Sequence, residues 1–324
     1  MDDRTVESLK ITIGNAGRIL VLTHIRPDGD AIGSLLGFGL ALQQAGKEVQ
    51  MVLEDSVPPN LRNLPGSRQI AKKPNGNFDL VAVVDCSDLK RMGSILDESA
   101  QPDINIDHHP TNEYYARINL VDTSAVATSE ILTKYLPQWD LPINKNIASA
   151  LLTGLITDTI GFRTPNVSGE TMRIVALLME HGAELSELYM RSLVARSFEA
   201  MRLWGAGLTH LQREGAIVWT SLTREDRLAA GYPGRDDADL INLLSAIKDA
   251  LVSIIFVEQP NGSIKVSWRA QPGVDVAQVA LSFGGGGNTV AAGAEINGDL
   301  NGVQASVLRE TQNLLTKNAV PPHP

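Results

Sequence analysis

The sequence has very little cysteine and no long apolar stretch. Cys86 is the only cysteine among 324 residues, so an internal disulfide and a cysteine-rich zinc site are both excluded. No run approaches the roughly 18 apolar residues that a membrane span needs, and the start, Met1-Asp2-Asp3, is too acidic for a signal peptide. These absences indicate a protein of a reducing compartment. We expect a cytoplasmic location and no membrane partner.

Positive charge is also scarce. The chain carries 28 Lys and Arg against 37 Asp and Glu, which gives a net charge of −9. This balance disfavours binding along a long nucleic-acid duplex, because such binding depends on clustered Lys and Arg. The hydrophobic fraction of 43% and the charged fraction of 20% are those of an ordinary globular protein. At about 100 to 200 residues per domain, the length predicts two domains.

The first half of the chain alternates short apolar runs with helical patterns. The strand runs are apolar on both sides, which is typical of a covered parallel sheet. Strands are predicted at 18–23, 48–53, 79–84 and 103–106, and helices at 31–45, 124–136, 144–157 and 168–181. This half is therefore expected to be an open α/β sheet, in which ligands bind at the carboxyl ends of the strands.

The second half predicts a smaller α/β domain after a helical connector of mixed charge. Its predicted strands are 216–222, 251–258 and 263–269, with Pro260-Asn261-Gly262 as a hairpin turn, and its predicted helices are 276–282 and 303–317. We expect a first domain at residues 1–185, a connector at 186–212, a second domain at 213–317 and a flexible tail at 318–324.

Asp or His comes directly after an apolar strand or helix in four places. These are residues 24–30 (HIRPDGD), Asp85, Asp107-His108-His109 and Asp158. Each alone is a weak indication, because a single Asp at such a point is usually a cap or loop residue, and Asp30 could itself cap the helix that begins at Ala31. Together they would crowd several carboxylates into one crevice with no cation among them. A bound metal would resolve that conflict.

The donor types indicate which metal. Carboxylate oxygen and imidazole nitrogen without thiolate favour a hard to borderline divalent ion, Mn²⁺ most naturally, with Mg²⁺, Co²⁺ or Fe²⁺ as alternatives. The donors exceed the demand of one ion, whereas two ions about 3.5 to 4 Å apart would use them all. Two divalent ions would also explain how an acidic protein can attract a polyanion.

These residues carry a resemblance to a known family. His24-x-x-Pro27-Asp28-x-Asp30-Ala31-x-Gly33-Ser34, then Asp85, Asp107-His108-His109 and Thr157-Asp158-Thr159, match in order the four motifs of the DHH phosphoesterase family. In addition, Ser267-x-Arg269 and Gly284-Gly285-Gly286-Gly287-x-x-x-Ala291-Ala292-Gly293 resemble the signature of the DHH-associated C-terminal domain. The length is similar to that of the stand-alone bifunctional nanoRNase (oligoribonuclease)/pAp phosphatase group.

The resemblance implies an open parallel-sheet DHH domain and a smaller α/β C-terminal domain, with the active site in the cleft between them. One manganese ion would be held by His24, Asp28 and Asp85, and the other by Asp30, Asp85, His108 and Asp158. His109 would face the scissile phosphate, and Asp107 would orient a histidine ligand. The nucleophile would be a water or hydroxide that bridges the ions, so Asp85, Asp107 and His109 are the expected catalytic residues.

The resemblance also implies a substrate-binding group. Its members would be Ser267, Arg269, Gly284, Gly285, Gly286, Gly287 and Asn288, with Arg163 and Arg26 as weaker candidates for phosphate contact. Arg269 can bind a phosphate through two hydrogen bonds or stack on a base, and glycine backbone can approach an anion closely. The family usually has a histidine in place of Asn288 and a serine in place of Ala270, which puts substrate choice and affinity in question.

The implied function is Mn²⁺-dependent hydrolysis of short oligonucleotides (nanoRNA) to mononucleotides, with 3′-phosphoadenosine 5′-phosphate (pAp) as a further substrate that would yield AMP. Two alternatives stay open, a cyclic di-AMP or pApA phosphodiesterase and a catalytically silent nucleotide-binding regulatory protein. A manganese pyrophosphatase would share the first domain, but the glycine-rich signature argues for a nucleotide substrate. The expected partners are short oligonucleotides or small phosphorylated nucleotides, and a homodimer stays open.

Overall fold

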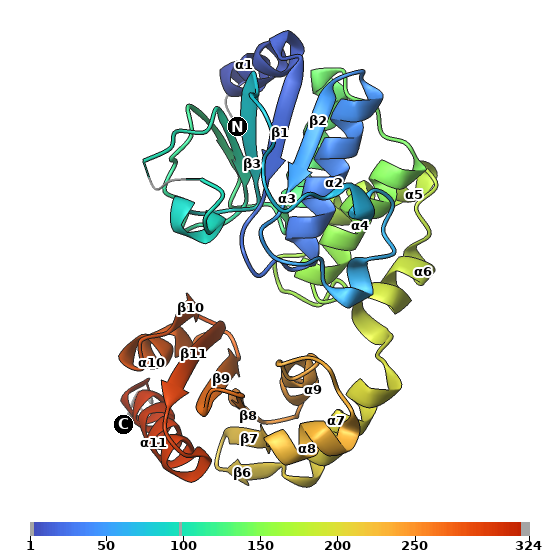
Figure 1. Cartoon of the computed structure of the whole chain (residues 1–324). Helices are drawn as coiled ribbons and strands as arrows, with labels where there is room; N and C mark the ends of the chain where they lie inside the picture. Colours follow the sequence, from blue (N-terminus) through green and yellow to red (C-terminus); the bar gives the residue numbers. More distant parts are fainter. Residues whose placement is uncertain (1–2, 97–98, 319–324) are drawn as a thin grey trace. The chain divides into compact units, whose positions relative to one another are not determined.

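The structure, a computed structural model, describes residues 3–96 and 99–318 of the chain. The chain divides into two compact units between Ala195 and Arg196 (Figure 1). Apart from Asn318, the tail that we expect at 318–324 lies outside the described residues. Among the helices of the described ranges, none is long and apolar enough to cross a membrane.

The first unit is built on a five-stranded sheet in which every pair of neighbours is parallel. The strands lie in the order β2-β1-β3-β4-β5, and they are β1 (Arg18–Leu22), β2 (Glu48–Val52), β3 (Leu80–Val84), β4 (Ile104–Asp107) and β5 (Ile118–Val121). The four predicted strands are confirmed, whereas β5 was not predicted because four mostly half-buried residues give little apolar signal. The strand order reverses between β1 and β3, and such a switch point is where open α/β sheets bind ligands.

The helices of the first unit are α1 (Asp3–Asn15), α2 (Gly29–Gln44), α3 (Thr128–Tyr135), α4 (Lys145–Asp158), α5 (Gly169–Glu180) and α6 (Leu185–Tyr189), which continues as a π-helical turn at Met190–Val194. The predicted helices 31–45, 144–157 and 168–181 are confirmed. The helix predicted at 124–136 begins only at Thr128, because Ala127 is extended and Asp122 Oδ1 accepts from the N–H of Ser124 in a preceding turn. The start at Thr128 leaves the first N–H groups of α3 free to bind side chains.

Two almost wholly buried helices, α2 and α4, pack against each other over glycine. A Cβ on Gly33 would lie 2.6 Å from the carbonyl oxygen of Ala150 and 2.8 Å from the nitrogen of Gly154. Gly154 likewise faces α2, since its own Cβ would lie 2.6 Å from Asp30 Oδ1. The two glycines therefore permit an approach that brings the first turn of α2 against α4.

The second unit is built on a six-stranded mixed sheet in the order β10-β11-β9-β8-β7-β6. Its strands are β6 (Gln212–Glu214), β7 (Ile217–Leu222), β8 (Val252–Glu258), β9 (Ser263–Ala270), β10 (Gly286–Asn288) and β11 (Ala291–Asn297). The hairpin predicted at Pro260-Asn261-Gly262 is confirmed, because β8 and β9 pair antiparallel around it. The strands β6, β10 and β11 were not predicted.

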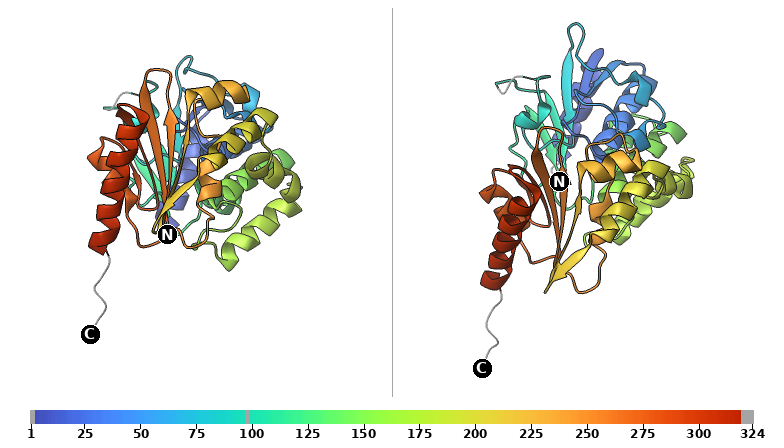
Figure 2. Two further views of the ribbon diagram at one scale, coloured as in Figure 1. Left: turned by 90° about the horizontal axis from the view of Figure 1, so that it is seen from below. Right: turned by 60° about the horizontal axis from the view of Figure 1, so that its bottom comes forward.

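Helices cover both faces of this second sheet. They are α7 (Phe198–Thr209), α8 (Arg224–Ala230), α9 (Leu240–Leu244), α10 (Val276–Ser282) and α11 (Leu300–Asn318). Trp268 and Phe256 share one buried cluster with Val279 of α10 and Val307 of α11, and Figure 2 shows α11 alongside the strands. Ile255 of the opposite face packs instead in a cluster with residues of α7, α8 and α9.

Candidate metal centre and substrate-binding strands

His24 lies at the switch point of the first sheet, two residues after the last residue of β1. Its Nδ1 lies 2.8 Å from the carbonyl oxygen of Ile25, which fixes the hydrogen on Nδ1 because a carbonyl can only accept. The side chain is buried, and its Nε2 has no hydrogen-bond partner among the residues that the structure describes. Nε2 lies 3.7 Å from Asp85 Oδ2. A buried lone pair beside a carboxylate is the arrangement that a metal ligand requires.

Asp85 lies directly after β3, the neighbour of β1. Its φ of 55° is in the left-handed region, a conformation that costs energy and is commonest at functional sites. Its N–H donates to the carbonyl of Ile106 at 2.9 Å, and its side chain is buried. Burial raises the pKa of this carboxyl, but the neighbouring imidazoles of His24, His108 and His109 outweigh it, so the net shift is downward. Asp85 is therefore held as an anion.

Asp28 and Asp30 flank the start of α2 and have different roles. The N-cap of α2 is Asp28, whose Oδ1 accepts from the N–H groups of Asp30 and Ala31 at 3.1 and 3.0 Å. The alternative in which Asp30 is the cap is therefore wrong, because its side chain points the other way, into the interior. There it is buried, and burial with the charges of Asp85 and Asp158 raises its pKa well above the ordinary value.

His108 and Asp158 complete the acidic cluster. His108 Nε2 lies 3.7 Å from Asp158 Oδ2 and 3.7 Å from Asp85 Oδ1. Burial, together with the charges of Asp28 and Asp85, raises the pKa of Asp158 to about 7. Groups of side chains with donor atoms within 4.8 Å of one another are His24-Asp28-Asp85, Asp30-His108-Asp158 and Asp85-His108-His109. The structure thus brings all six expected ligand residues into one cluster.

The donor set fits divalent cations. Asp30 and Asp158 have raised pKa values because burial, together with the neighbouring carboxylates, disfavours their charged forms, while the unpartnered Nε2 of His24 lies 3.7 Å from Asp85 Oδ2. A divalent cation would relieve the repulsion and use the free lone pair at once. Oxygen and imidazole donors suit Mn²⁺, Mg²⁺ and similar ions.

His109 lies beside this cluster and is held by Asp107. Its Nδ1 lies 2.7 Å from Asp107 Oδ1, and the other oxygen of Asp107 accepts from Nδ2 of Asn112 at 2.6 Å. Burial lowers the pKa of His109, but the bond to Asp107 and the charge of Asp85 outweigh it and raise the pKa to about 9. The histidine that Asp107 contacts is therefore His109. Asn112 was not predicted, because nothing in its local sequence marks it.

The comparisons with known proteins agree with this geometry. The DHH family, N-terminal domain, matches residues 18–155, and the DHHA1 domain matches residues 228–316. The bifunctional oligoribonuclease and PAP phosphatase NrnA of Thermus thermophilus is 35% identical over 308 residues, which are 93% of this chain and 91% of that protein. The protein of the same name from Bacillus subtilis is 26% identical over 88% of this chain and 91% of its own length.

The chain belongs to the DHH family. It is accordingly a hydrolase, a metal-dependent phosphoesterase with the two-domain architecture of that family. The crystal structure of an exopolyphosphatase-related protein from Bacteroides fragilis aligns with 98% of this chain and 97% of its own, with a TM-score of 0.87 and 25% identity. RecJ of Thermus thermophilus in complex with Mn²⁺ aligns over 99% of this chain and 55% of its own, with a TM-score of 0.52 and 15% identity, and shares the fold.

The DHHA1 domain carries the expected substrate-binding residues on adjacent strands. Asn288 of β10 pairs with Ala291 of β11, and Ala291 pairs with Arg269 of β9. Ser267, two residues from Arg269, lies on the same face because side chains alternate along a strand. The register therefore sets Asn288, Arg269 and Ser267 on one face, whereas Trp268 between the last two is buried on the other.

The arginine of this row is partly enclosed. Arg269 is half-buried, and its Nη1 donates to the carbonyl oxygen of Trp268 at 3.0 Å. Burial lowers the pKa of its guanidinium, while Asp237 and Asp239 counteract the shift. Arg269 is therefore not a freely solvated surface residue, and a partly desolvated guanidinium binds phosphate more strongly than an exposed one.

The four glycines have separate roles. Gly284 and Gly285 donate their N–H groups to Leu281 and Ala280 of α10, so those groups end a helix. A Cβ on Gly285 would meet the carbonyl of Gly293, and one on Gly287 would meet the carbonyl of Ala291. A Cβ on Gly286, by contrast, has no atom within 4 Å in the part of the chain described. Gly286 is thus a position where a ligand could approach the backbone, whereas Gly285 and Gly287 are explained by close packing and Gly284 by its positive φ of 75°.

Arg163 and Arg26 lie near the metal ligands in sequence and are both exposed. Arg163 follows a turn in which Ile160, Gly161 and Phe162 all have positive φ, between 51° and 70°. A left-handed β-branched residue such as Ile160 is unusual, and strain of this kind gathers at functional sites. Arg26 also has a positive φ of 53°, and its N–H donates to Asp55. Neither side chain belongs to the acidic cluster.

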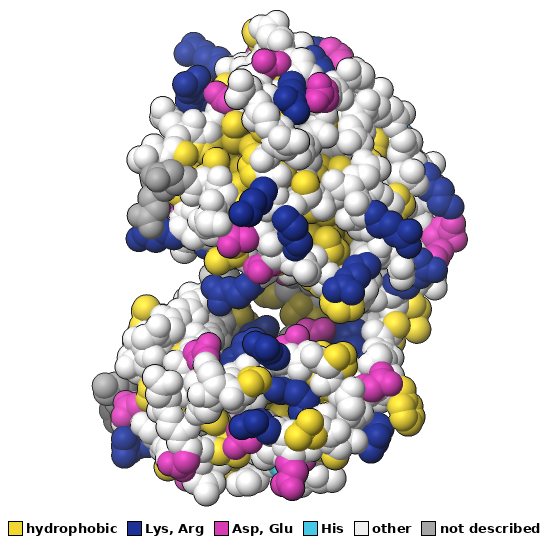
Figure 3. Space-filling model, viewed as in Figure 1, with side chains coloured by type: hydrophobic (Ala, Val, Ile, Leu, Met, Phe, Trp, Pro, Cys, Tyr) yellow, Lys and Arg dark blue, Asp and Glu magenta, His cyan; other side chains and the backbone are white. Residues whose placement is uncertain are grey.

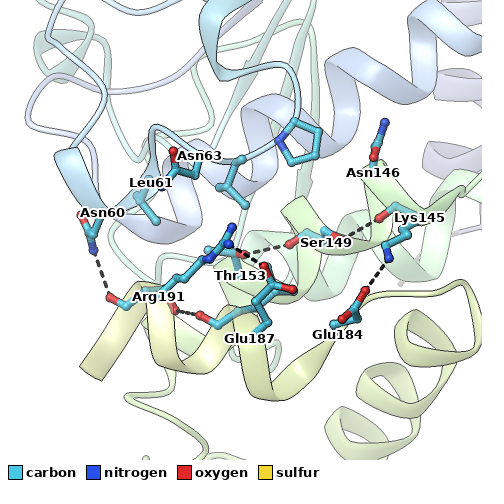
Figure 4. A pocket seen from close by; sticks show the side chains of 14 residues that line it. Asn60, Leu61, Asn63, Lys145, Asn146, Ser149, Thr153, Glu184, Glu187 and Arg191 are labelled. Carbon is cyan, nitrogen blue, oxygen red and sulfur yellow. Dashed lines mark hydrogen bonds and ion pairs between the residues drawn. The ribbon is translucent and has the colours of Figure 1, made fainter. Parts of the chain in front are cut away.

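A pocket of about 250 Å³ lies at the other end of α4 (Figure 4). Its lining includes Lys145, which pairs with Glu184, and Arg191, which pairs with Glu187. Asn60 donates to the carbonyl oxygen of Ser192 at 3.0 Å and ties the π-helical turn to the pocket wall. The cations of this pocket are already neutralised by their partners, which distinguishes it from the acidic cluster at Asp158.

Proposed function

We propose that this DHH protein uses two Mn²⁺ ions to hydrolyse short oligonucleotides to mononucleotides and pAp to AMP. The observation that carries the proposal is the pair of donor groups His24-Asp28-Asp85 and Asp30-His108-Asp158, with Asp85 Oδ1 only 3.7 Å from His108 Nε2. Asp85 is thus the residue able to serve both groups. The names of the full-length relatives from Thermus thermophilus and Bacillus subtilis support the substrate class.

The protein's own side chains supply the rest of the chemistry. When bound, divalent ions lower the pKa of water and neutralise charge on the phosphate oxygens. His109 is protonated at neutral pH because Asp107 accepts its Nδ1 hydrogen. The protonated ring can donate a hydrogen bond from Nε2 to a phosphate oxygen, or a proton to the leaving oxygen. Asp107, buried and bonded to Asn112, keeps the ring in one orientation.

We propose residues 213–317 as the substrate-binding domain, joined by the connector at 186–212 to the catalytic domain at 1–185. Arg269 would bind a terminal phosphate, and Asn288 and Ser267 would add neutral hydrogen bonds from the same face of the sheet. On the face of this unit drawn in Figure 3, Lys and Arg side chains gather together, with Asp and Glu mostly around them. A local positive surface favours an anionic substrate even though the net charge is −9.

Two observations bear on the alternatives. A regulatory protein that lost catalysis would be expected to lack ligands, whereas all six expected ligand residues lie together here. No feature of the described residues favours cyclic di-AMP over a linear dinucleotide, so that substrate enters only as an arm of the test.

The test is a substrate panel on metal-free protein reloaded with Mn²⁺, Mg²⁺ or Co²⁺. The panel holds di- to pentaribonucleotides, pAp, pApA, cyclic di-AMP and pyrophosphate, with Asp158→Asn as the matched inactive control. We expect Mn²⁺ to restore cleavage of the short oligonucleotides and pAp, and the control to show none. Preferential turnover of cyclic di-AMP or pyrophosphate, or full activity with chelator present, would contradict the proposed function.

A further inference from the structure

The N-terminus of α3 lies directly on two of the buried carboxylates. The N–H of Thr128 donates to Asp30 Oδ2 at 2.6 Å, and the N–H of Ser129 donates to Asp30 Oδ1 at 3.1 Å. Both side chains add a bond of their own, from Ser129 Oγ to Asp30 Oδ1 at 2.5 Å and from Thr128 Oγ1 to Asp85 Oδ1 at 3.0 Å. All four residues are buried. The first turn of this helix therefore contacts one carboxylate from each proposed ion site.

These bonds leave the two oxygens of Asp30 unequal. Oδ1 accepts from the nitrogen and the hydroxyl of Ser129 and also from Ser34 Oγ, at 3.2 Å. Oδ2 accepts only from the N–H of Thr128 among the described residues. A carboxylate oxygen has about two lone-pair positions, so Oδ1 is fully occupied and Oδ2 keeps one free. The donors thus select the oxygen that can bind a cation.

The fold keeps space for these donors. A Cβ at position 154 would collide with Ser129 Oγ and lie 2.6 Å from Asp30 Oδ1. Gly154 of α4 is therefore required where the hydroxyl and the carboxylate meet. Formation of α3 does not require the hydroxyl of Ser129. Among the described residues, Ser129 Oγ bonds only to Asp30 and Ser34, which both lie outside α3.

We propose that Thr128 and Ser129 are positioning residues for the divalent ions: their hydroxyls fix Asp85 and Asp30 in the orientation that binds the ions. The inference rests on the two-ion site proposed above and deepens it. Residues that orient metal ligands typically contribute about 10- to 100-fold to metal affinity. Ser129 touches Asp30, a ligand of one proposed site only, whereas Thr128 touches Asp85, which serves both. The two hydroxyls therefore have distinguishable effects.

The experiment is isothermal titration calorimetry of Mn²⁺ into metal-free Thr128→Val, Ser129→Ala and unaltered protein. We expect Ser129→Ala to raise the Kd of one ion about tenfold and leave the other within about twofold, and Thr128→Val to raise both about tenfold. Thr128→Ser, which keeps the hydroxyl, should restore both affinities. If Ser129→Ala does not fold, as judged by circular dichroism, the test rests on the loss of affinity in the nearly isosteric Thr128→Val and its recovery in Thr128→Ser.

The matched control is Thr133→Val. Thr133 is equally buried in α3, but its hydroxyl donates to the carbonyl oxygen of Ser129 at 2.7 Å and not to a carboxylate. Its Mn²⁺ affinities should match those of the unaltered chain. Unchanged affinities in Thr128→Val and Ser129→Ala, or an equal loss in Thr133→Val, would overturn the inference while leaving the two-ion function in place. If the unaltered chain binds no ion, both the inference and the proposed function fail.

Discussion

His109 Nδ1 lies 2.7 Å from Asp107 Oδ1, and Asp107 is itself fully buried. A buried carboxylate that accepts from an imidazole keeps that imidazole protonated, which is the state needed to donate toward a phosphate. Asn112 holds the opposite oxygen of Asp107 and in turn donates to Asn105. The ring is thus fixed by a network that runs into the interior of the first unit.

The first prediction concerns the charge on His109. In the metal-free protein its pKa is about 9, so the protonated ring stabilises the fold fully below pH about 6.5, and that contribution is lost as the pH rises through about 9. Asp107→Asn removes the charged acceptor and should bring the pKa of His109 down toward about 6.5. NMR titration of histidine-labelled protein measures the pKa of His109 in the unaltered protein and in Asp107→Asn. An unchanged titration of His109 would show that Asp107 does not set its charge.

The second prediction concerns Asp158. Its pKa is raised from 3.8 to about 7, so its contribution to the stability of the metal-free fold is present below pH about 4 and is lost as the pH rises through about 7. The melting temperature of Asp158→Asn should therefore be a few degrees higher than that of the unaltered metal-free protein at pH about 8. Each kcal/mol of added stability corresponds to roughly 2 to 4 °C. Differential scanning calorimetry at pH 5 and pH 8 measures the difference, which should shrink at the lower pH. A lower melting temperature for the variant at pH 8 would refute the repulsion argument.

The same variant should lose its response to metal. Added Mn²⁺ should raise the melting temperature of the unaltered protein by mass action and raise that of Asp158→Asn much less. Turnover of a dinucleotide should fall by at least about 100-fold, because a proposed ligand is missing. Retention of full turnover would exclude Asp158 as a ligand.

The third prediction separates binding from catalysis. Arg269→Ala should raise KM for a short oligonucleotide about tenfold, or roughly 1.4 kcal/mol, with a smaller effect on kcat. Lys265→Ala is the matched control, because Lys265 is exposed on the same face of β9, four residues away. Steady-state kinetics of both variants decides whether the effect belongs to Arg269. Equal KM values in Arg269→Ala and the unaltered protein would show that the arginine does not contact substrate.

The fourth prediction concerns Asn288, which is exposed and lies in the same row of the sheet as Arg269. An amide cannot carry charge, so the unaltered enzyme should act more weakly on pAp than on a dinucleotide. Asn288→His should increase kcat/KM for pAp several-fold, with a gain that fades as the pH rises through about 6.5. Kinetics on both substrates between about pH 6 and 8 provides the comparison. Equal gains on both substrates would mean that the imidazole introduced by Asn288→His does not interact with the charge of the additional phosphate.

Local sequence was sufficient for the parts of the molecule that depend on local rules. The runs at 18–23 and 79–84 became β1 and β3, because apolar stretches of that length are stable only as covered strands. His24 and Asp85 follow those strands directly, so their meeting at one edge followed from the parallel arrangement. The family could therefore be predicted before any contact was known, as could the meeting of the residues that we propose as metal ligands.

The contacts that set charge and orientation depended on the tertiary structure. Thr128 meets Asp30 across 98 positions of the chain, and Ser129 meets it across 99. Neither pair has a local signal, since each forms only where the first turn of α3 reaches the crossing of α2 and α4. The pKa values of the carboxylates also depended on the tertiary structure. The same residue type, Asp, has a lowered pKa at position 85 and a raised pKa at positions 30 and 158. The sequence determined which ionisable groups are present, whereas burial and the donors around each group, which only packing arranges, decided which of them carry charge.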